Sequence, residues 1–209
     1  MQSPASKCKN YDKTFYPLSK RPYFPIREDF DSGYDDFMSR WKAGITSHLT
    51  AYHTVENGKL TIVMPNNGTK DKTYSVYPLE QAGIDRSYLE CKVILNQHMK
   101  GVILQMNTTD GSIKAVYNRE YGYIYLYNRS SSTGWVSSVA ANFNAGVEYT
   151  FRLEVDNGTI RVKQNGNLLK TYADKAPLGS LTYLPQVGNV NYYTGDSIAI
   201  YDYIENAKL

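Results

Sequence analysis

The segment at residues 149–172 constrains the fold more than any other part of the chain. Every second residue from Tyr149 to Val155 is apolar, and polar or charged residues fall between them. This two-residue period is typical of a strand with one face in a core and the other in water. Glycine turns at 156–158 and 165–166 divide the segment into three strands. Asn and Gly adopt positive φ at little cost, so both turns favour antiparallel hairpins.

The same alternation recurs along the chain and predicts an all-β fold. Turn residues separate the candidate strands at regular spacings, which indicates an antiparallel β-sandwich. A hairpin is expected around Asn57 and Gly58, and a helix only briefly, at 35–42 or 79–84. The remaining strands are expected at residues 87–95, 101–106, 113–117, 123–127, 149–155, 159–163, 168–172 and 197–204.

Length and composition favour one large β-domain, expected at residues 28–209 of the 209-residue chain. Residues 1–27 carry Pro17, Pro22 and Pro25 among polar and aromatic residues, which predicts an extended N-terminal arm without its own core. The net charge of +3 comes from scattered Lys and Arg, so nucleic acid is not an expected partner. No apolar run is long enough for a membrane span.

The chain has two cysteines, Cys8 and Cys91. Cys91 alternates with Leu89, Val93 and Leu95, so it is expected to point into the core as a small hydrophobe. A bridge to Cys8 would bring the arm inside, and the free thiol is therefore the expected state. The two residues have no metal-ligand spacing.

The alternation also predicts which side chains share a surface. Tyr88, Glu90 and Lys92 form the polar row of one strand, and Gln105 and Asn107 belong to the polar row of the next. If these strands are neighbours, the rows form one sheet face with amides and charges for the hydroxyls or carboxylates of a glycan. An ordinary solvated face is the competing interpretation.

Twenty tyrosines are the unusual number in the composition. Tyr123, Tyr125 and Tyr127 line one face of their strand, opposite Ile124 and Leu126. Tyrosine rings pack well between strands, and they also stack on sugars or build protein interfaces. Both uses fit the pattern.

Four segments occur in an order that is similar to a known family. They are ECK at 90–92, GVILQMNTTDGSIKAVYNREYGYIYLY at 101–127, YTFRLEVDNGTIRVKQNG at 149–166 and YLPQVGNVNYYTGDSIAIYDYI at 183–204. This order resembles concanavalin A-like jelly rolls, and among them the alginate-lyase-type polysaccharide lyases and their non-catalytic relatives. The resemblance implies a jelly-roll sandwich.

The lyases of that family use an R-T-E-L-R strand, a Q-I-H strand and a late Y-F-K-x-G-x-Y strand to cleave uronate-containing glycans by β-elimination. By resemblance, the strand at 88–92 keeps a Glu and a basic residue, and Gln105 keeps the neutralising amide. Asn107 stands where the lyases have His, and an amide does not titrate in the range that a general base needs. Tyr192 or Tyr193 would supply the catalytic Tyr only with a shift in the late segment.

No cofactor is expected, and no cysteine or histidine set predicts a metal site. Structural Ca²⁺ would come from loop acids at Asp31, Asp35 and Asp36, for which an acidic solvated turn is the other interpretation. Glycoside hydrolases of similar fold need paired carboxylates on one strand, and no such set follows Glu154 and Asp156.

Three functions remain open from the sequence. The leading hypothesis is a carbohydrate-binding protein that recognises polysaccharide on one sheet face, in an extracellular or surface-associated location. The second is a diverged lyase. The third is a structural or assembly protein, a surface or virion component, whose arm docks on a neighbour and builds a homo-oligomer or larger assembly.

Overall fold

The computed structural model describes residues 26–43, 50–68, 71–78, 86–108, 111–128, 135–156, 158–173, 181–191 and 195–209. These residues form fifteen strands and one short helix. In chain order the elements are β1 (Ile26–Glu28), α1 (Tyr34–Arg40), β2 (Trp41–Ala43), β3 (Tyr52–Glu56), β4 (Lys59–Met64), β5 (Thr73–Pro78), β6 (Arg86–Leu95), β7 (Met99–Thr108), β8 (Gly111–Asn118), β9 (Tyr123–Asn128), β10 (Ser137–Ala140), β11 (Glu148–Asp156), β12 (Thr159–Gln164), β13 (Asn167–Ala173), β14 (Leu181–Asn191) and β15 (Ser197–Lys208).

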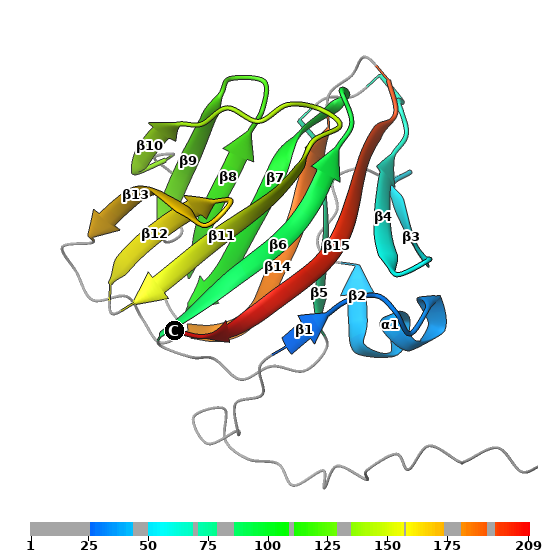
Figure 1. The fold of residues 1–209 in the computed structure, drawn as a ribbon, viewed down its shortest axis with the longest axis horizontal. Coiled ribbons are helices and arrows are strands. Elements are labelled where there is room, and N and C mark those ends of the chain that lie inside the picture. Colours follow the sequence, from blue (N-terminus) through cyan, green and yellow to red (C-terminus); the bar gives the residue numbers. More distant parts are fainter. Residues whose placement is uncertain are drawn as a thin grey trace, which may run out of the picture.

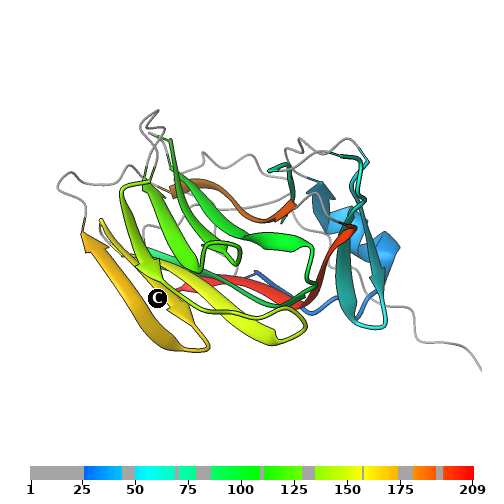
Figure 2. The same cartoon turned by 90° about the horizontal axis from the view of Figure 1, so that it is seen from above.

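The described strands form two antiparallel sheets (Figure 1). Sheet A has eight strands, in the order β13-β12-β11-β6-β15-β4-β3, with β1 also paired to β15. Sheet B has seven strands, in the order β10-β9-β8-β7-β14-β5-β2. Figure 2 shows the sheets as two stacked layers. The predicted antiparallel β-sandwich is therefore confirmed.

The hairpins predicted from Asn-Gly pairs are present. Asn165 and Gly166 join β12 to β13 with φ of 50° and 77°, and Asn57 and Gly58 join β3 to β4 with φ of 53° and 67°. Two successive positive φ values define the turn whose twist matches that of the strands it connects. At Gly58 a Cβ would also lie 2.8 Å from Asp31 Oδ1, so glycine is needed there for space as well as for φ.

The core lies between the sheets and is filled by the apolar rows that the alternation predicts. Sheet A contributes Leu89, Cys91, Val93, Leu95, Phe151, Leu153, Val155, Ile160 and Val162, and sheet B contributes Val102, Leu104, Met106, Ile124 and Leu126. None of these side chains is more than 3% exposed. Each large one gains about 1.5–3 kcal/mol by leaving water, which decides which face of every strand points outward.

Tyr117 ties the two sheets together through the core. It extends from β8 in sheet B, and its ring centroid lies 4.3 Å from that of Phe151 in sheet A. Its hydroxyl lies 2.8 Å from the carbonyl oxygen of Arg152 and 3.2 Å from that of Lys163, to which it donates. Complete burial raises the pKa of Tyr117 well above its ordinary value, so the phenol stays neutral.

Four strands of sheet B, β2, β5, β10 and β14, are not among the strands expected from the sequence. β14 lies at the centre of the sheet, between β7 and β5. Its pairing with β7 shifts between Tyr183 and Gln186, on either side of Pro185. Proline has no N–H to give to the ladder, so it interrupts both the pairing and the alternation by which strands are recognised.

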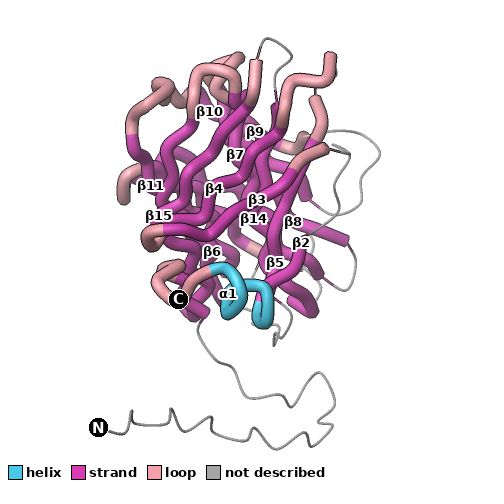
Figure 3. Tube along the Cα trace, turned by 90° about the vertical axis from the view of Figure 1, so that its right-hand side faces the viewer, coloured by secondary structure: helices cyan, strands magenta, loops and turns pink. Residues whose placement is uncertain are grey.

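One end of the sandwich is closed by β1, α1 and β2, and Figure 3 shows the helix there. The Phe37 ring of α1 stacks on Trp41, with centroids 5.6 Å apart. Glu28, which is 3% exposed, holds these elements together. It accepts hydrogen bonds of 3.0 Å from the Trp41 indole and from the backbone N–H of Phe30, and its Oε2 lies 2.6 Å from an Arg40 nitrogen.

The helix expected at 35–42 is α1, whereas 79–84 lies outside the described residues. The arm expected at 1–27 also lies outside them, apart from Ile26 and Arg27. These two residues belong to β1 and pair with β15, so the sheet begins two residues before the predicted boundary.

Cys91 is a free and fully buried thiol. Burial raises its pKa well above the ordinary value, which suppresses the reactive thiolate. Its place in the core is the predicted one, and Cys8 lies outside the described residues.

Candidate functional site

The five residues that the sequence groups on one face lie in two different sheets. Tyr88, Glu90 and Lys92 belong to β6 of sheet A, whereas Gln105 and Asn107 belong to β7 of sheet B. The turn between these strands carries the chain from one layer to the other, so β6 pairs with β11 and β15, and β7 with β8 and β14. The expectation of a single face was wrong, because consecutive strands of a sandwich need not be neighbours.

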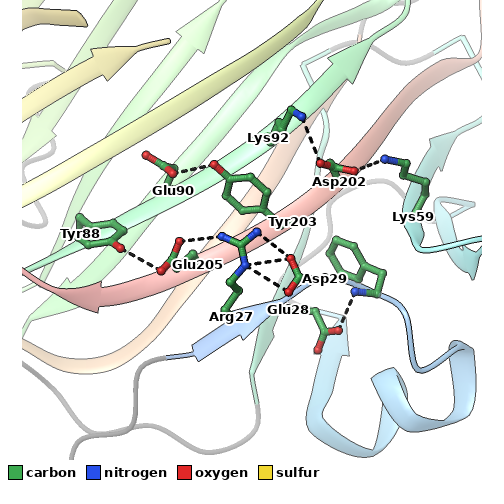
Figure 4. A network of polar contacts seen from close by, with 11 residues as sticks. Arg27, Glu28, Asp29, Lys59, Tyr88, Glu90, Lys92, Asp202, Tyr203 and Glu205 are labelled. Atoms are coloured by element: carbon green, nitrogen blue, oxygen red, sulfur yellow. Dashed lines mark hydrogen bonds and ion pairs between the residues drawn. The ribbon is translucent and has the colours of Figure 1, made fainter. Parts of the chain in front are cut away.

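The outer face of sheet A, which we call the charged face, carries a network of ion pairs (Figure 4). It is formed by Arg27, Lys59, Arg86, Tyr88, Glu90, Lys92, Glu148, Arg152, Glu154, Asp156, Arg161, Lys163, Asp202, Tyr203 and Glu205. Contacts between neighbouring strands connect β12, β11, β6, β15 and β4 across this surface. Three of the predicted site residues are part of it.

Two tyrosine hydroxyls donate to carboxylates across the β6–β15 pair. Tyr88 Oη lies 3.0 Å from Glu205 Oε1, and Tyr203 Oη lies 2.7 Å from Glu90 Oε1. Burial, followed by the hydrogen bond to Glu205, raises the pKa of Tyr88 to about 12. Burial and the bond to Glu90 likewise raise the pKa of Tyr203. Both phenols are therefore neutral donors held by the chain itself.

Arg152 lies at the centre of the network. Its guanidinium carbon is 3.5 Å from the centroid of the Tyr88 ring, and one of its nitrogens is 3.6 Å from Glu90 Oε2. Its Nε lies 2.9 Å from Glu154 Oε1, and Lys163 Nζ lies 2.6 Å from the same oxygen. Glu154 is only 4% exposed, so these two cations take the place of water around its carboxylate.

Lys92 is bound by two carboxylates. Its Nζ lies 2.8 Å from Glu148 Oε1 and 3.3 Å from Asp202 Oδ2, while Lys59 pairs with the other oxygen of Asp202. A β-bulge at 201–203 allows two successive residues of β15 to face outward, which brings Asp202 into the network. The hydrogen bonds to Glu148 and Asp202 raise the pKa of Lys92, and the bond from Lys59 lowers that of Asp202.

Most charged groups of this face thus have ion-pair partners within the chain, although the buried Arg152 Nε forms no hydrogen bond. A ligand carboxylate at Lys92 would have to displace Glu148 or Asp202. Exchange of one exposed ion pair for another changes the free energy little, because each is worth about 1 kcal/mol or less. This surface stabilises the sheet and offers little to a ligand.

The outer face of sheet B, which we call the aromatic face, carries rings, amides and hydroxyls. Its described members include Ile103, Gln105, Ser112, Lys114, Val116, Tyr123, Tyr125, Tyr127 and, beside the sheet edge, Trp135. The strands of sheet B contain no Asp or Glu, and their lysines are Lys42, Lys100 and Lys114. Lys100 is buried and already paired, at 2.5 Å with Asp71 and at 2.8 Å with Glu120.

Aromatic rings form a row along one side of this face. The rings of Tyr123 and Tyr125 are stacked with centroids 6.1 Å apart, and Trp135 lies 5.7 Å from Tyr125. Trp135 is 53% exposed and Tyr123 is 42% exposed. Aromatic rings that pack against one another and stay exposed to water present apolar faces and polar edges to a ligand. The tyrosine row on β9 is the one that the alternation predicts.

Lys114 and Gln105 extend this row across the sheet. In the strand register Lys114 lies opposite Tyr127 on β9 and opposite Gln105 on β7. Directly opposed residues have Cβ atoms about 4.5–5.5 Å apart, so a phenol, an ammonium and an amide stand in line over three strands. Burial, and then the neighbouring Tyr125, raises the pKa of Tyr127, which keeps its hydroxyl protonated.

Two members of the aromatic face were missed from the sequence. Lys114 alternates with the buried Ile113 and Ala115, so the signal that it points outward was present. What was missing was the pairing of β8 with β7, which places Lys114 beside Gln105. Trp135 lies two residues before β10, a strand too short for alternation to identify.

The described residues do not assemble the elimination site of a lyase. Lys92 and Gln105, which the resemblance assigns to one sugar carboxylate, lie on opposite outer faces of the sandwich. Tyr192 and Tyr193 lie outside the described residues, and only the backbone of Asn107 is described.

The described part of the chain holds no group of three or more His, Cys, Asp or Glu side chains that could bind a metal ion. Asp36, one of the acids expected to hold Ca²⁺, lies 2.6 Å from Arg40, and hydrogen bonds from Ser32 and Arg40 lower its pKa. A Ca²⁺ site with Asp31 and Asp35 stays a prediction. Within the same described ranges, no helix has the length and apolar character to cross a membrane.

Comparison with known proteins establishes the fold. No family model and no curated protein matches the sequence. A structure from work on endo-acting O-glycanases of the human gut microbiota aligns with a TM-score of 0.64 and 16% identity, over 88% of this chain and 98% of that one.

Two other solved structures have the same architecture. The Ca²⁺-bound exoplasmic/lumenal domain of VIP36 aligns with a TM-score of 0.61 and 10% identity, over 88% of this chain and 90% of that one. The potassium-bound carbohydrate recognition domain of Emp46p aligns with a TM-score of 0.59 and 14% identity, over 82% and 90%. The chain thus has the concanavalin A-like jelly-roll fold of these structures, and nothing singles out the alginate-lyase branch.

Proposed function

We propose that the protein binds a polysaccharide or another glycan through the aromatic face. The observation that carries this proposal is the row of mutually supported, exposed rings beside the amide of Gln105 and the ammonium of Lys114. A pyranose has an apolar face that stacks on a ring, and its hydroxyls exchange hydrogen bonds with amides and phenols.

The solved structures of similar fold support this assignment. Emp46p is represented by its carbohydrate recognition domain, and VIP36 by a form with Ca²⁺ and Man3GlcNAc bound. The carbohydrate-binding module CBM66 from Bacillus subtilis also shares the fold. Fold likeness alone does not choose a surface, so the choice of the aromatic face rests on the side chains of this chain.

A glycan array with purified wild-type protein and the double variant Tyr125→Ala/Trp135→Ala tests the proposal. Loss of two ring contacts should raise the Kd at least about thirtyfold, since an aromatic anchor contributes about 2 kcal/mol or more to binding. Tyr52→Ala is the matched control, because Tyr52 is 50% exposed but lies on β3 of sheet A. Wild-type binding that survives in the double variant would place the glycan elsewhere, and an array without any signal would reject glycan binding.

The other two functions expected from the sequence stay predictions. A lyase would raise the absorbance of unsaturated products when incubated with alginate or polyglucuronate, and the described geometry gives it no support. Assembly through the arm concerns residues 1–27, of which only Ile26 and Arg27 are described. The extracellular or surface-associated location is likewise a prediction that goes with glycan binding.

A further inference from the structure

Lys114 lies half-buried on the outer face of sheet B, in a setting unlike that of the paired lysines Lys92 and Lys100. Its neighbours on the aromatic face are Tyr127 and Gln105, which are uncharged, and the strands of sheet B contain no acid. Within the described residues, no carboxylate forms an ion pair with Lys114, whereas Lys92 and Lys100 each have two.

The position of this ammonium favours an anion as its partner. Lys114 is half-buried between side chains that exclude part of the water, which strengthens its attraction for a negative charge. An ammonium that is partly desolvated and has no counter-charge gains more from a ligand anion than one already held by two carboxylates. The flanking Tyr127 phenol can donate a hydrogen bond to the sugar that carries the charge.

We infer that the glycan carries an acidic group, a uronate carboxylate or a sulfate ester, which pairs with Lys114 while the adjoining sugars lie on the rings of Tyr125 and Trp135. This inference rests on the proposed function, since it names the ligand class of the same surface. It differs from the sequence-based hypothesis in which Lys92 holds the acid, because Lys92 lies in the other sheet.

Pairs of polysaccharides with one backbone and different charge test the inference. Polygalacturonate is compared with its methyl-esterified form for carboxylate, and dextran sulfate with dextran for sulfate, by isothermal titration calorimetry at 50 and 300 mM NaCl. The wild type should bind the charged member of one pair at least tenfold more tightly than the neutral member. The pair that shows this preference identifies the acidic group as a carboxylate or a sulfate.

Lys114→Gln should abolish this preference, so that the charged member binds no more tightly than the neutral one. Lys114→Arg should restore it, because the guanidinium keeps the charge. Lys42→Gln, at an exposed lysine of β2 in the same sheet, is the matched control for the loss of one net charge and should keep the preference.

The outcomes separate the two proposals. Equal binding of charged and neutral glycans by the wild type overturns the inference about the acid and leaves glycan binding intact. A preference that survives in Lys114→Gln, or is lost equally in Lys42→Gln, also overturns it, since the attraction then belongs to the net charge. Failure to bind any of these glycans or any on the array rejects the proposed function itself.

Discussion

The two outer faces of the sandwich are built by the same alternation and yet carry opposite kinds of surface. On sheet A the outward rows contain acids and bases on neighbouring strands, and they pair with one another from Lys163 to Lys59. On sheet B the outward rows contain rings, amides and Lys114, without an acid on any strand. The charges of the first surface pair with one another, whereas the second surface presents exposed rings and a lysine without a carboxylate partner among the described residues.

This difference indicates which outer face of the sandwich is expected to carry ligand-binding residues. A charged residue on an exposed strand is a weak indication of a site when the next strand carries its partner, as Glu148 does for Lys92. A ring or a cation that lacks such a partner is a stronger indication. Changes on the charged face should therefore alter stability, and changes on the aromatic face should alter binding.

The largest effect is expected at Glu154, on the charged face. Glu154→Ala leaves Arg152 and Lys163 without the buried carboxylate that both contact, and should lower the free energy of unfolding by about 3 kcal/mol. Urea denaturation followed by tryptophan fluorescence measures it. Glu148→Ala, at an exposed carboxylate of the same strand, is the control and should cost less than about 1 kcal/mol. Equal losses of stability in the two variants would show that the contribution of a carboxylate to this network does not depend on its burial.

Trp135→Ala should have the next largest effect, on binding alone. Loss of the ring that contacts Tyr125 should weaken glycan binding by about 2 kcal/mol, about thirtyfold in Kd. The free energy of unfolding should change by less than about 0.5 kcal/mol, because the side chain is 53% exposed. A stability loss as large as that of Glu154→Ala would mean that the aromatic face is structural, and the comparison would fail.

A smaller and pH-dependent effect is expected at Tyr88. Its pKa of about 12 in the folded protein exceeds the ordinary value of 10.0, so the folded state keeps a proton that the unfolded state loses. This contribution to stability is present in full below pH 10 and is lost as the pH rises toward 12. Tyr88→Phe removes the contribution, so its stability deficit relative to wild type should shrink between pH 9 and pH 11 in urea denaturation. A deficit that stays constant would contradict the role of the bond to Glu205.

The smallest effect is expected at Lys92, which the sequence places in the binding site. Lys92→Ala should leave the affinity for glycan within twofold of wild type, because its Nζ is already held by Glu148 and Asp202. Calorimetry with the best ligand from the array measures this. A tenfold loss of affinity in Lys92→Ala, together with an unchanged affinity in Trp135→Ala, would place glycan binding on the charged face instead of the aromatic face.

Much of the fold could be predicted from local patterns, and part of the site could. The strands β6, β7, β8, β9, β11, β12, β13 and β15 follow from alternation, and the hairpin at Asn57 and Gly58 follows from its turn residues. β14 could not be recognised, since Pro185 interrupts its ladder. Gln105 was predicted as a site residue and lies on the aromatic face. Lys114 and Trp135 were missed because alternation shows neither the pairing of β8 with β7 nor the contact between Trp135 and Tyr125.

The alternation in the sequence determines which side chains of each strand enter the core and which enter water, because a two-residue period is a local property of the backbone. Which outward rows lie side by side depends on the order of the strands in each sheet, which is a property of the tertiary structure. The connection between β6 and β7 crosses from one layer to the other and so separates Lys92 from Gln105, whereas the pairing of β7 with β8 places Lys114 beside Gln105. The reason is physical: the order of strands in a sheet depends on how whole layers bury their apolar faces, which no single strand encodes.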